Sequence, residues 1–212
     1  MKNWDDFYQS YADKTEPEIE LVRLVSTLKK MNIVNVLDVG CGTGRNSIYL
    51  AQQGFRVYGI DISKMAIQIA KKNSIGLPIE YFIGQQTRLP FQNNSIDFIL
   101  ANHSLEYLKS DDILRTVREF DRVLKNKKPI FLKVDSKEYN YQRLPLNLEN
   151  LAHVLFCIKN KIPIHFFSER ELRCLFDNYD IKKLEHIEVD ESDGDYIREF
   201  YLFALKRYTK MT

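Results

Sequence analysis

The sequence has few cysteines and no metal-binding spacing. Its three cysteines, Cys41, Cys157 and Cys174, lie far apart without a C-x-x-C pair, and its four histidines show no H-x-x-x-H pattern. A disulfide framework and a zinc site are therefore disfavoured. We expect no metal, and a reducing cytoplasm as the compartment.

A long apolar run is also lacking. No stretch approaches the ~18 residues of a membrane span, and residues 1–10 lack the apolar core of a signal peptide. The formal net charge is only +2, which gives no strong electrostatic attraction to nucleic acid or membrane. We expect a soluble protein without a membrane partner, for which a nucleic acid is a disfavoured partner.

Repeats, low-complexity tracts and flexible linkers are absent as well, and strand-like and helix-like segments alternate instead. Strands are predicted near 32–39, 56–61, 79–83, 96–100 and 129–134, with a late pair near 181–189 and 197–205. Ser63 and Ser168 are predicted to cap the helices that follow them. The alternation predicts a mostly parallel sheet with helices on both faces. A chain of 212 residues suits one such domain, 1–212.

A glycine-rich loop follows the first predicted strand. Gly40, Gly42 and Gly44 let the backbone turn sharply and approach a ligand closely. Asp38 lies two residues before the loop, and Asp61 ends the next strand, where a carboxylate can bind both hydroxyls of a ribose. The pattern predicts a site for a ribose-containing cofactor.

The glycine spacing separates the nucleotide-binding classes. The nicotinamide fingerprint G-x-G-x-x-G, started at Gly40, needs a glycine where this chain has Arg45. A G-x-x-x-x-G-K-[ST] phosphate loop is also absent. A dinucleotide oxidoreductase is therefore a disfavoured alternative.

The segment Val36–Gly44 resembles the first motif of class I S-adenosylmethionine-dependent methyltransferases. Leu89–Phe91, Ser95–Phe98 and Glu119–Leu124 are similar to later segments of that family. Gly40–Ala51 and the stretch 166–172 resemble its small tellurite-resistance type, and the broader "type 11" pattern fits nearly as well. The resemblance implies a Rossmann-like three-layer αβα sandwich, with a seven-stranded, mostly parallel sheet whose last strand is antiparallel.

The resemblance also implies which residues bind S-adenosyl-L-methionine and its product S-adenosyl-L-homocysteine. The glycines would lie under the methionine and ribose, Asp38 near the ammonium, and Asp61 on the ribose hydroxyls. Gln85 and Gln86 stand where relatives often have an acid for the adenine amine, but an amide oxygen can still accept from that amine. The full predicted set is Tyr11, Asp38, Gly40, Cys41, Gly42, Gly44, Asp61, Ile62, Gln85, Gln86 and Asn102.

The implied activity is methyl transfer by in-line displacement to a small-molecule acceptor through O, N, S or a chalcogen. A base is needed only for a neutral hydroxyl or amine, and His103, after the fourth strand, is the leading candidate. The alternative is a histidine that hydrogen-bonds nearby backbone. A non-catalytic cofactor-binding regulator stays open. A nucleic-acid methyltransferase is less favoured, because residues 101–104 lack the N/D-P-P-Y/F motif and no Pro-Cys occurs.

Two segments are expected to cover the site. Trp4, Phe7, Tyr8 and Tyr11 have helical spacing, so residues 1–31 are predicted to form an N-terminal helical lid, with an ordinary amphipathic helix as the alternative. The aromatic-rich insertion 136–167 is predicted to cover the acceptor. It could instead pack on the core or on a second subunit, which leaves a homodimer open.

Overall fold

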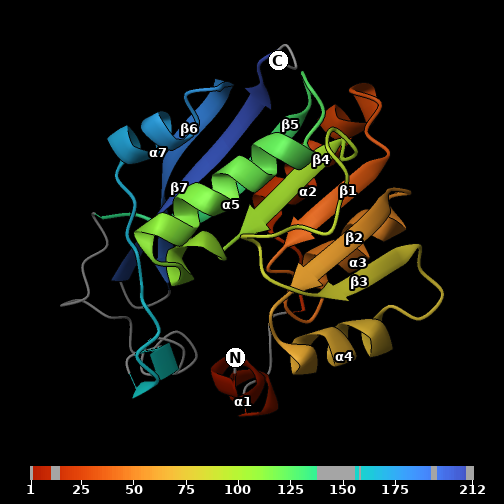
Figure 1. Ribbon diagram of the computed structural model, residues 1–212, viewed down its shortest axis with the longest axis vertical. Coiled ribbons are helices and arrows are strands. Elements are labelled where there is room, and N and C mark those ends of the chain that lie inside the picture. The colour runs from red at the N-terminus through yellow and green to blue at the C-terminus, as the bar shows by residue number, and fades with distance from the viewer. Residues whose placement is uncertain (1, 11–14, 138–155, 158, 192–194, 209–212) are drawn as a thin grey trace.

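The computed structural model describes residues 2–10, 15–137, 156–157, 159–191 and 195–208, and a seven-stranded sheet forms its centre (Figure 1). The strand order is β3-β2-β1-β4-β5-β7-β6. Within this sheet β7 runs antiparallel to both of its neighbours, β5 and β6, and the other neighbouring strands pair in parallel. The strands are β1 Asn35–Val39, β2 Arg56–Asp61, β3 Ile79–Ile83, β4 Phe98–Asn102, β5 Pro129–Asp135, β6 Tyr179–Glu191 and β7 Asp195–Lys206.

Helices cover both faces of the sheet. Apolar side chains of α5 and α7 share one buried cluster with the sheet, and those of α2 and α3 share another. The helices are α1 Lys2–Ser10, α2 Ile19–Lys30, α3 Arg45–Gln52, α4 Lys64–Asn73, α5 Ser110–Val123 and α7 Glu169–Leu175, with a short 3-10 turn η1 at Leu105–Tyr107. This three-layer arrangement confirms the predicted fold class.

Apolar side chains on alternate residues of a strand bury both faces of the sheet. In β1, Leu37 and Val39 join one apolar cluster while Val36 joins the other. A parallel strand buried on both faces needs such a continuous apolar run. Because β1, β2 and β4 run parallel, their carboxyl ends meet at one edge of the sheet, where ligands bind in open α/β sheets.

Local signals locate the elements well, with shifts of two or three residues at some strand ends, such as the start of β1 at Asn35 in place of residue 32. Ser63 Oγ accepts from the backbone N–H of Ala66, at 3.0 Å, and Ser168 forms the predicted capping box. The fourth strand begins two residues later than predicted, at Phe98, because Ile96 pairs in an isolated bridge with Leu124. This shift places Asn102 as the last residue of β4.

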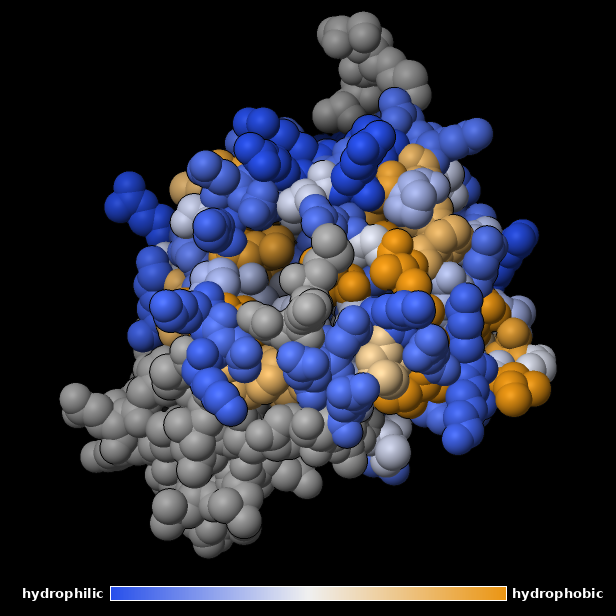
Figure 2. Space-filling view, turned by 60° about the horizontal axis from the view of Figure 1, so that its bottom comes forward, coloured by the Kyte–Doolittle hydropathy of each residue, from blue (hydrophilic) through white to orange (hydrophobic). Residues whose placement is uncertain are grey.

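The outer surface mixes hydrophilic and hydrophobic residues, as one face shows in Figure 2. Large exposed hydrophobic side chains come from separate elements, for example Ile19, Ile75 and Leu114. None of the helices in the described ranges combines the length and apolar character that a membrane span requires.

Candidate active site

The glycine loop needs its glycines for backbone conformation. Gly40, Gly42 and Gly44 have φ angles of 68°, 55° and 90°, in the left-handed region that side chains disfavour. A Cβ on Gly40 would also lie 2.5 Å from the Cβ of Ser104, in the loop after β4. The G-x-G-x-G spacing therefore reflects a turn that brings the ends of β1 and β4 together.

Asp61 holds this loop from the end of β2. Its Oδ2 accepts from the backbone N–H of Gly42 at 2.9 Å, and its Oδ1 accepts from that of Ser63 at 2.8 Å. The residue is buried. A carboxylate oxygen can accept more than one donor, so Asp61 can anchor the loop and still bind ribose hydroxyls.

Asp38 lies beneath the loop, almost fully buried. Its Oδ2 accepts from Ser47 Oγ at 2.6 Å. Burial raises the pKa of Asp38 to about 6 although the Ser47 hydroxyl and Arg45 oppose the shift, and the nearby Asp61 carboxylate raises it further. A buried acid with this tendency is stabilised in its charged form by an approaching cation.

The other predicted cofactor residues surround the same edge. Cys41 is buried within the loop, Ile62 is half-buried after β2, and Gln85 is exposed. Gln86 Nε2 donates to the backbone oxygen of Ser104 at 3.0 Å. Tyr11 lies outside the described residues.

The residues present fit S-adenosylmethionine. Asn102 is only 8% exposed, and its Oδ1 has no hydrogen-bond partner within the described part of the chain. A buried polar atom without a partner is costly, and a methionine ammonium would supply the missing donor. Together with the acids Asp38 and Asp61 and the close-approach loop, this atom suits a cationic, ribose-containing cofactor.

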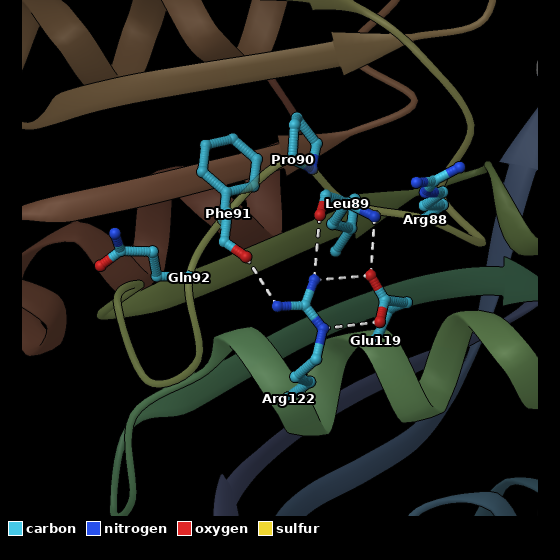
Figure 3. Close-up of a pocket in the computed structure, with 7 residues that line it drawn as sticks. All are labelled: Arg88, Leu89, Pro90, Phe91, Gln92, Glu119 and Arg122. Carbon is cyan, nitrogen blue, oxygen red and sulfur yellow. Dashed lines mark hydrogen bonds and ion pairs between the residues drawn. The ribbon is translucent and has the colours of Figure 1, made fainter.

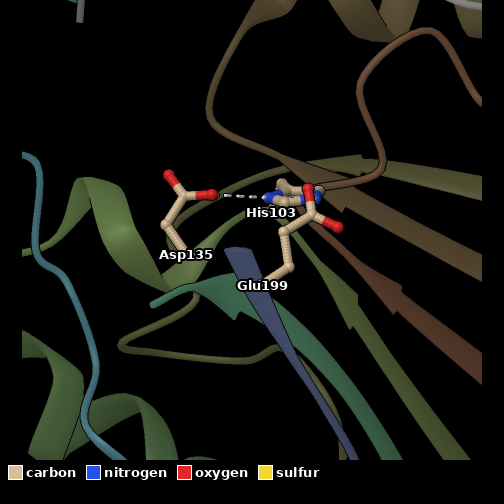
Figure 4. Close-up of side chains that lie close together, drawn as sticks. All are labelled: His103, Asp135 and Glu199. Atoms are coloured by element: carbon tan, nitrogen blue, oxygen red, sulfur yellow. Dashed lines mark ion pairs between the residues drawn. The ribbon is translucent and has the colours of Figure 1, made fainter. Parts of the chain in front are cut away.

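His103 lies among carboxylates at the end of β4. Its Nδ1 is 2.8 Å from Oε1 of Glu106 and 3.7 Å from Oδ1 of Asp135, while its Nε2 is 3.2 Å from Oε1 of Glu199. Figure 4 shows the imidazole between the side chains of β5 and β7. A neutral imidazole carries only one N–H, so these contacts at both nitrogens favour the doubly protonated imidazolium. The sequence alternative of a backbone hydrogen bond does not describe this side chain, because carboxylates are its partners.

The charges in this cluster are strongly coupled. Burial lowers the pKa of His103, but the carboxylates of Glu199 and Glu106 outweigh it and raise the pKa well above 6.5. Burial and the Glu106 charge raise the pKa of Asp135 to about 7, although His103 opposes them. Burial opposes ionisation of Glu199, yet His103 and Lys133 lower its pKa to about 2. The carboxylates around His103 thus favour its imidazolium form.

A buried lysine extends the network and was missed by sequence reasoning. Lys133 Nζ lies 2.7 Å from Glu199 Oε2 and 3.0 Å from Glu18 Oε1. The Arg45 guanidinium also contacts the segment before α2, because it donates to the backbone oxygen of Glu16 at 2.7 Å. Sequence position could have located Asp135, since it ends β5 as Asn102 ends β4. Glu18, Lys133 and Glu199 gave no such signal.

The side chains of His103, Asp135 and Glu199 place ligand-type atoms within 4.8 Å of one another, an arrangement that could hold a metal ion. Ion pairs account for this proximity. One oxygen of Glu199 is 2.7 Å from the Lys133 ammonium, and both imidazole nitrogens face carboxylates. We therefore interpret the cluster as an ion-pair network, and the absence of a metal stays a prediction.

Helix α1 docks beside this edge. Asp5 Oδ1 accepts from Ser63 Oγ at 2.6 Å and from the backbone N–H of Met65 at 2.9 Å, at the start of α4. Trp4 packs against Tyr107 of η1, with ring centroids 5.0 Å apart, and near Phe156 at 6.1 Å. Within the predicted lid 1–31 these contacts belong to α1, because α2 packs into the core of the sheet. Most of the insertion 136–167 lies outside the described residues.

A hollow of about 690 Å³ lies elsewhere, against α5, and none of the predicted site residues lines it (Figure 3). Arg122 donates to the backbone oxygens of Phe91 and Leu89, at 2.6 and 2.9 Å, and pairs with Glu119 at 2.7 Å. Glu119 in turn accepts from the backbone N–H of Leu89 at 2.7 Å. These polar groups satisfy one another, so we interpret the hollow as part of a structural clamp.

The glycine loop and the fold are similar to those of known proteins. Residues 36–127 match the sequence profile of a family described as "Methyltransferase domain". A S-adenosylmethionine-dependent methyltransferase from Methanosarcina mazei superimposes with a TM-score of 0.67 at 25% identity, covering 85% of this chain and 98% of that one. Residues 36–127 thus match a methyltransferase domain, and the described fold is similar to that of a S-adenosylmethionine-dependent methyltransferase, in agreement with the resemblance of the sequence.

Particular relatives act on diverse acceptors. The malonyl-[acyl-carrier protein] O-methyltransferase of Hamiltonella defensa is 30% identical over 57% of this chain and 44% of its own length. The ubiquinone biosynthesis O-methyltransferase of Pasteurella multocida is 29% identical over 66% of each chain. TehB from Haemophilus influenzae shares the fold, with a TM-score of 0.69 at 17% identity, over 96% of this chain and 67% of that one.

The curated matches are partial. The alignment covers 44% of the length of the Hamiltonella enzyme. It covers 38% of the putative methyltransferase YqeM of Bacillus subtilis and 40% of the norajmaline N-methyltransferase of Rauvolfia serpentina, so the chain spans less than half the length of these curated relatives. The family profile ends at residue 127, before β5 and β7. The match therefore includes the cofactor loop and His103, but not Asp135 or Glu199.

Proposed function

We propose that this protein transfers a methyl group from S-adenosylmethionine to a small-molecule acceptor by in-line displacement. The observation that carries the proposal is the cofactor edge. Three left-handed glycines form a loop anchored by Asp61, and the buried Asn102 Oδ1 lacks a donor. The cofactor, when bound, supplies an electrophilic methyl group on a cationic sulfur.

The residues of the chain would divide the work of binding. Asp61 and the glycine loop would hold the ribose, Asn102 and Asp38 the methionine end, and Ile62 and Gln86 the adenine end. Tyr11, Cys41 and Gln85 complete the proposed cofactor set. Helix α1 would exclude water, because its aromatic rings pack over η1. Methyl transfer of this kind depends mainly on such positioning.

Acceptor binding would occur on the other side of β4. His103, Asp135 and Glu199 extend from the carboxyl ends of β4 and β5 and from β7, next to η1 (Figure 4). Curated relatives with small-molecule names, such as the trans-aconitate 2-methyltransferase of Escherichia coli, favour a small acceptor over a nucleic acid.

Calorimetric titration with S-adenosylmethionine and S-adenosylhomocysteine tests the proposal, with NADH as the control ligand. We expect both adenosyl ligands to bind and NADH to give no heat of binding. Binding of NADH alone would favour an oxidoreductase. Binding of both adenosyl ligands without turnover of hydroxyl, amine, thiol or chalcogen acceptors would favour a non-catalytic regulator.

A further inference from the structure

Two carboxylates at the acceptor edge have unused hydrogen-bonding capacity. Glu106 is fully buried, and its Oε1 receives the Nδ1 proton of His103, whereas its Oε2 has no partner among the described residues. The Asp135 side chain is 20% exposed and lies 3.7 Å from the same Nδ1, too far for a hydrogen bond. Within the described residues, Glu106 Oε2 therefore lacks a donor, and the contact of the Asp135 carboxylate with His103 is longer than a hydrogen bond.

Negative charge exceeds positive charge at this point. The single imidazolium of His103 is shared by the carboxylates of Glu106, Asp135 and Glu199. Lys133 forms its ion pairs with Glu199 and with Glu18 and Glu20 of the N-terminal segment, and none with Asp135 within the described residues. Burial and the charge of Glu106 together raise the pKa of Asp135 to about 7, as expected where carboxylates repel one another. One additional cation would relieve this repulsion.

Aromatic rings adjoin the two carboxylates. Tyr107 follows Glu106 in η1, and burial followed by the charges of Glu106 and Asp135 raises its pKa well above 10. Trp4 of α1 packs edge-on against Tyr107 and lies near Phe156. Ring faces attract organic cations, especially where water is excluded. Acids and rings together resemble the lining of an ammonium site.

We propose that Asp135 and Glu106 bind the amino group of the acceptor, so that this protein is an N-methyltransferase of a cationic small amine. The inference rests on the proposed function and names its substrate class. An ammonium carries three donors and can serve both carboxylates, whereas a hydroxyl carries one. A thiolate or an oxyanion would be repelled by the same acids.

Asp135 then also receives the proton that must leave. The ammonium gives one proton to the Asp135 carboxylate, which frees the nitrogen lone pair. The nitrogen–methyl bond forms as the sulfur–methyl bond of the cofactor breaks, and the electron pair of that bond stays on sulfur as a neutral thioether. A carboxyl with a raised pKa is better matched to this transfer than an ordinary one. The titratable groups that influence Asp135 are Glu106, His103, Glu199, Lys133 and Cys157.

The test uses the full chain saturated with S-adenosylhomocysteine and three probe ligands of similar shape. These are phenethylamine, the neutral 2-phenylethanol and the anionic 3-phenylpropionate, with methylamine and tryptamine as smaller and larger amines. We expect an amine to bind at least about tenfold more tightly than the alcohol, the scale of one charge-assisted hydrogen bond. We expect no binding of the anion.

The variant Asp135→Asn should weaken amine binding by about tenfold or more and leave the affinity for the alcohol unchanged. Asp111→Asn, which removes an exposed acid at the start of α5, is the charge-matched control and should change neither affinity. Binding of S-adenosylhomocysteine is measured first in each protein, so a folding failure or a failure of the proposed function is recognised separately.

Three results would overturn the inference while the cofactor still binds. The alcohol could bind as tightly as the amines, none of the amines could bind, or Asp135→Asn could leave amine affinity unchanged. If a productive amine is found, its turnover should rise with pH through about 7 in the parent protein. That rise should be absent in Asp135→Asn, and its persistence there would assign the proton to another group.

Discussion

Replacing Asp61 by alanine should weaken cofactor binding and stability by separate, comparable amounts. The carboxylate anchors Gly42 and Ser63 through backbone hydrogen bonds of 2.9 and 2.8 Å. A hydrogen bond to a charged group contributes about 1.5–3 kcal/mol, so losing two should lower the free energy of unfolding by about 3 kcal/mol or more. The midpoint of thermal unfolding should fall by about 6–12 °C in a chain of this size.

Loss of the proposed ribose contact adds an effect on affinity. One charge-assisted interaction corresponds to about 10–150-fold in the dissociation constant for S-adenosylhomocysteine. Calorimetric titration below the unfolding transition measures this change, and urea denaturation without ligand measures the stability change. The loss of unfolding free energy reports the anchoring of the loop by Asp61, and the loss of affinity reports its contact with the ligand.

Asp97→Ala provides a matched control at the opposite edge of the sheet. Asp97 is buried as well, and it accepts from the backbone N–H groups of Val34 and Asn35 at 3.3 and 2.9 Å. Its loss should lower stability by a similar amount and leave affinity unchanged. An Asp61→Ala protein that is folded, less stable and still binds with parent affinity would refute the ribose assignment. Equal affinity losses in both variants would show that the effect comes from destabilisation.

Three further predictions concern the loop, the buried acid and the clamp. Gly40→Ala should lower the free energy of unfolding by about 1–3 kcal/mol and abolish the heat of cofactor titration, because the new Cβ would collide with Ser104 in a left-handed turn. An unaffected titration would show that the cofactor does not need the close approach of the loop backbone. Affinity for S-adenosylmethionine should fall as the pH falls through about 6, since Asp38 takes up a proton there and loses its attraction for the ammonium. Calorimetry between pH 5 and 8 measures this fall in the parent protein and in Asp38→Asn. An equally steep fall in the variant would exclude Asp38 as the group that titrates. Arg122→Ala should lower the free energy of unfolding by about 2–3 kcal/mol, because the hydrogen bonds to two carbonyls and the ion pair with Glu119 are lost. Urea denaturation measures this loss. Arg122→Lys should recover only part of the stability, and full recovery would mean that the several donors of the guanidinium are not needed.

Local chemistry explains which parts of the fold could be predicted. The strand–helix alternation, the Ser63 and Ser168 caps and the glycine loop depend on neighbouring residues, and the structure has them where expected. The boundary of β4 shifted because Ile96 bridges to Leu124, a tertiary contact without a local signal.

The candidate site divides in the same way. The sequence pointed to Asp61 because this residue ends the strand that follows the loop, and the structure places its carboxylate on the loop. The carboxylates around His103 had no such signal. Its partner Glu199 is 96 residues further along the chain and reaches β4 only through β7. Long-range pairing of this kind depends on sheet order, which the hydrophobic pattern does not specify.

The antiparallel pairing of β5 and β7 has a consequence for how the molecule assembles. Asp135 and Glu199 are direct cross-strand neighbours, and two like charges so placed repel each other. His103 and Lys133 offset part of that repulsion in the native register. A slip of one residue would turn Glu199 to the other face of the sheet and leave both cations without it. The native register of β5 and β7 is therefore the one that brings Glu199 to both His103 and Lys133.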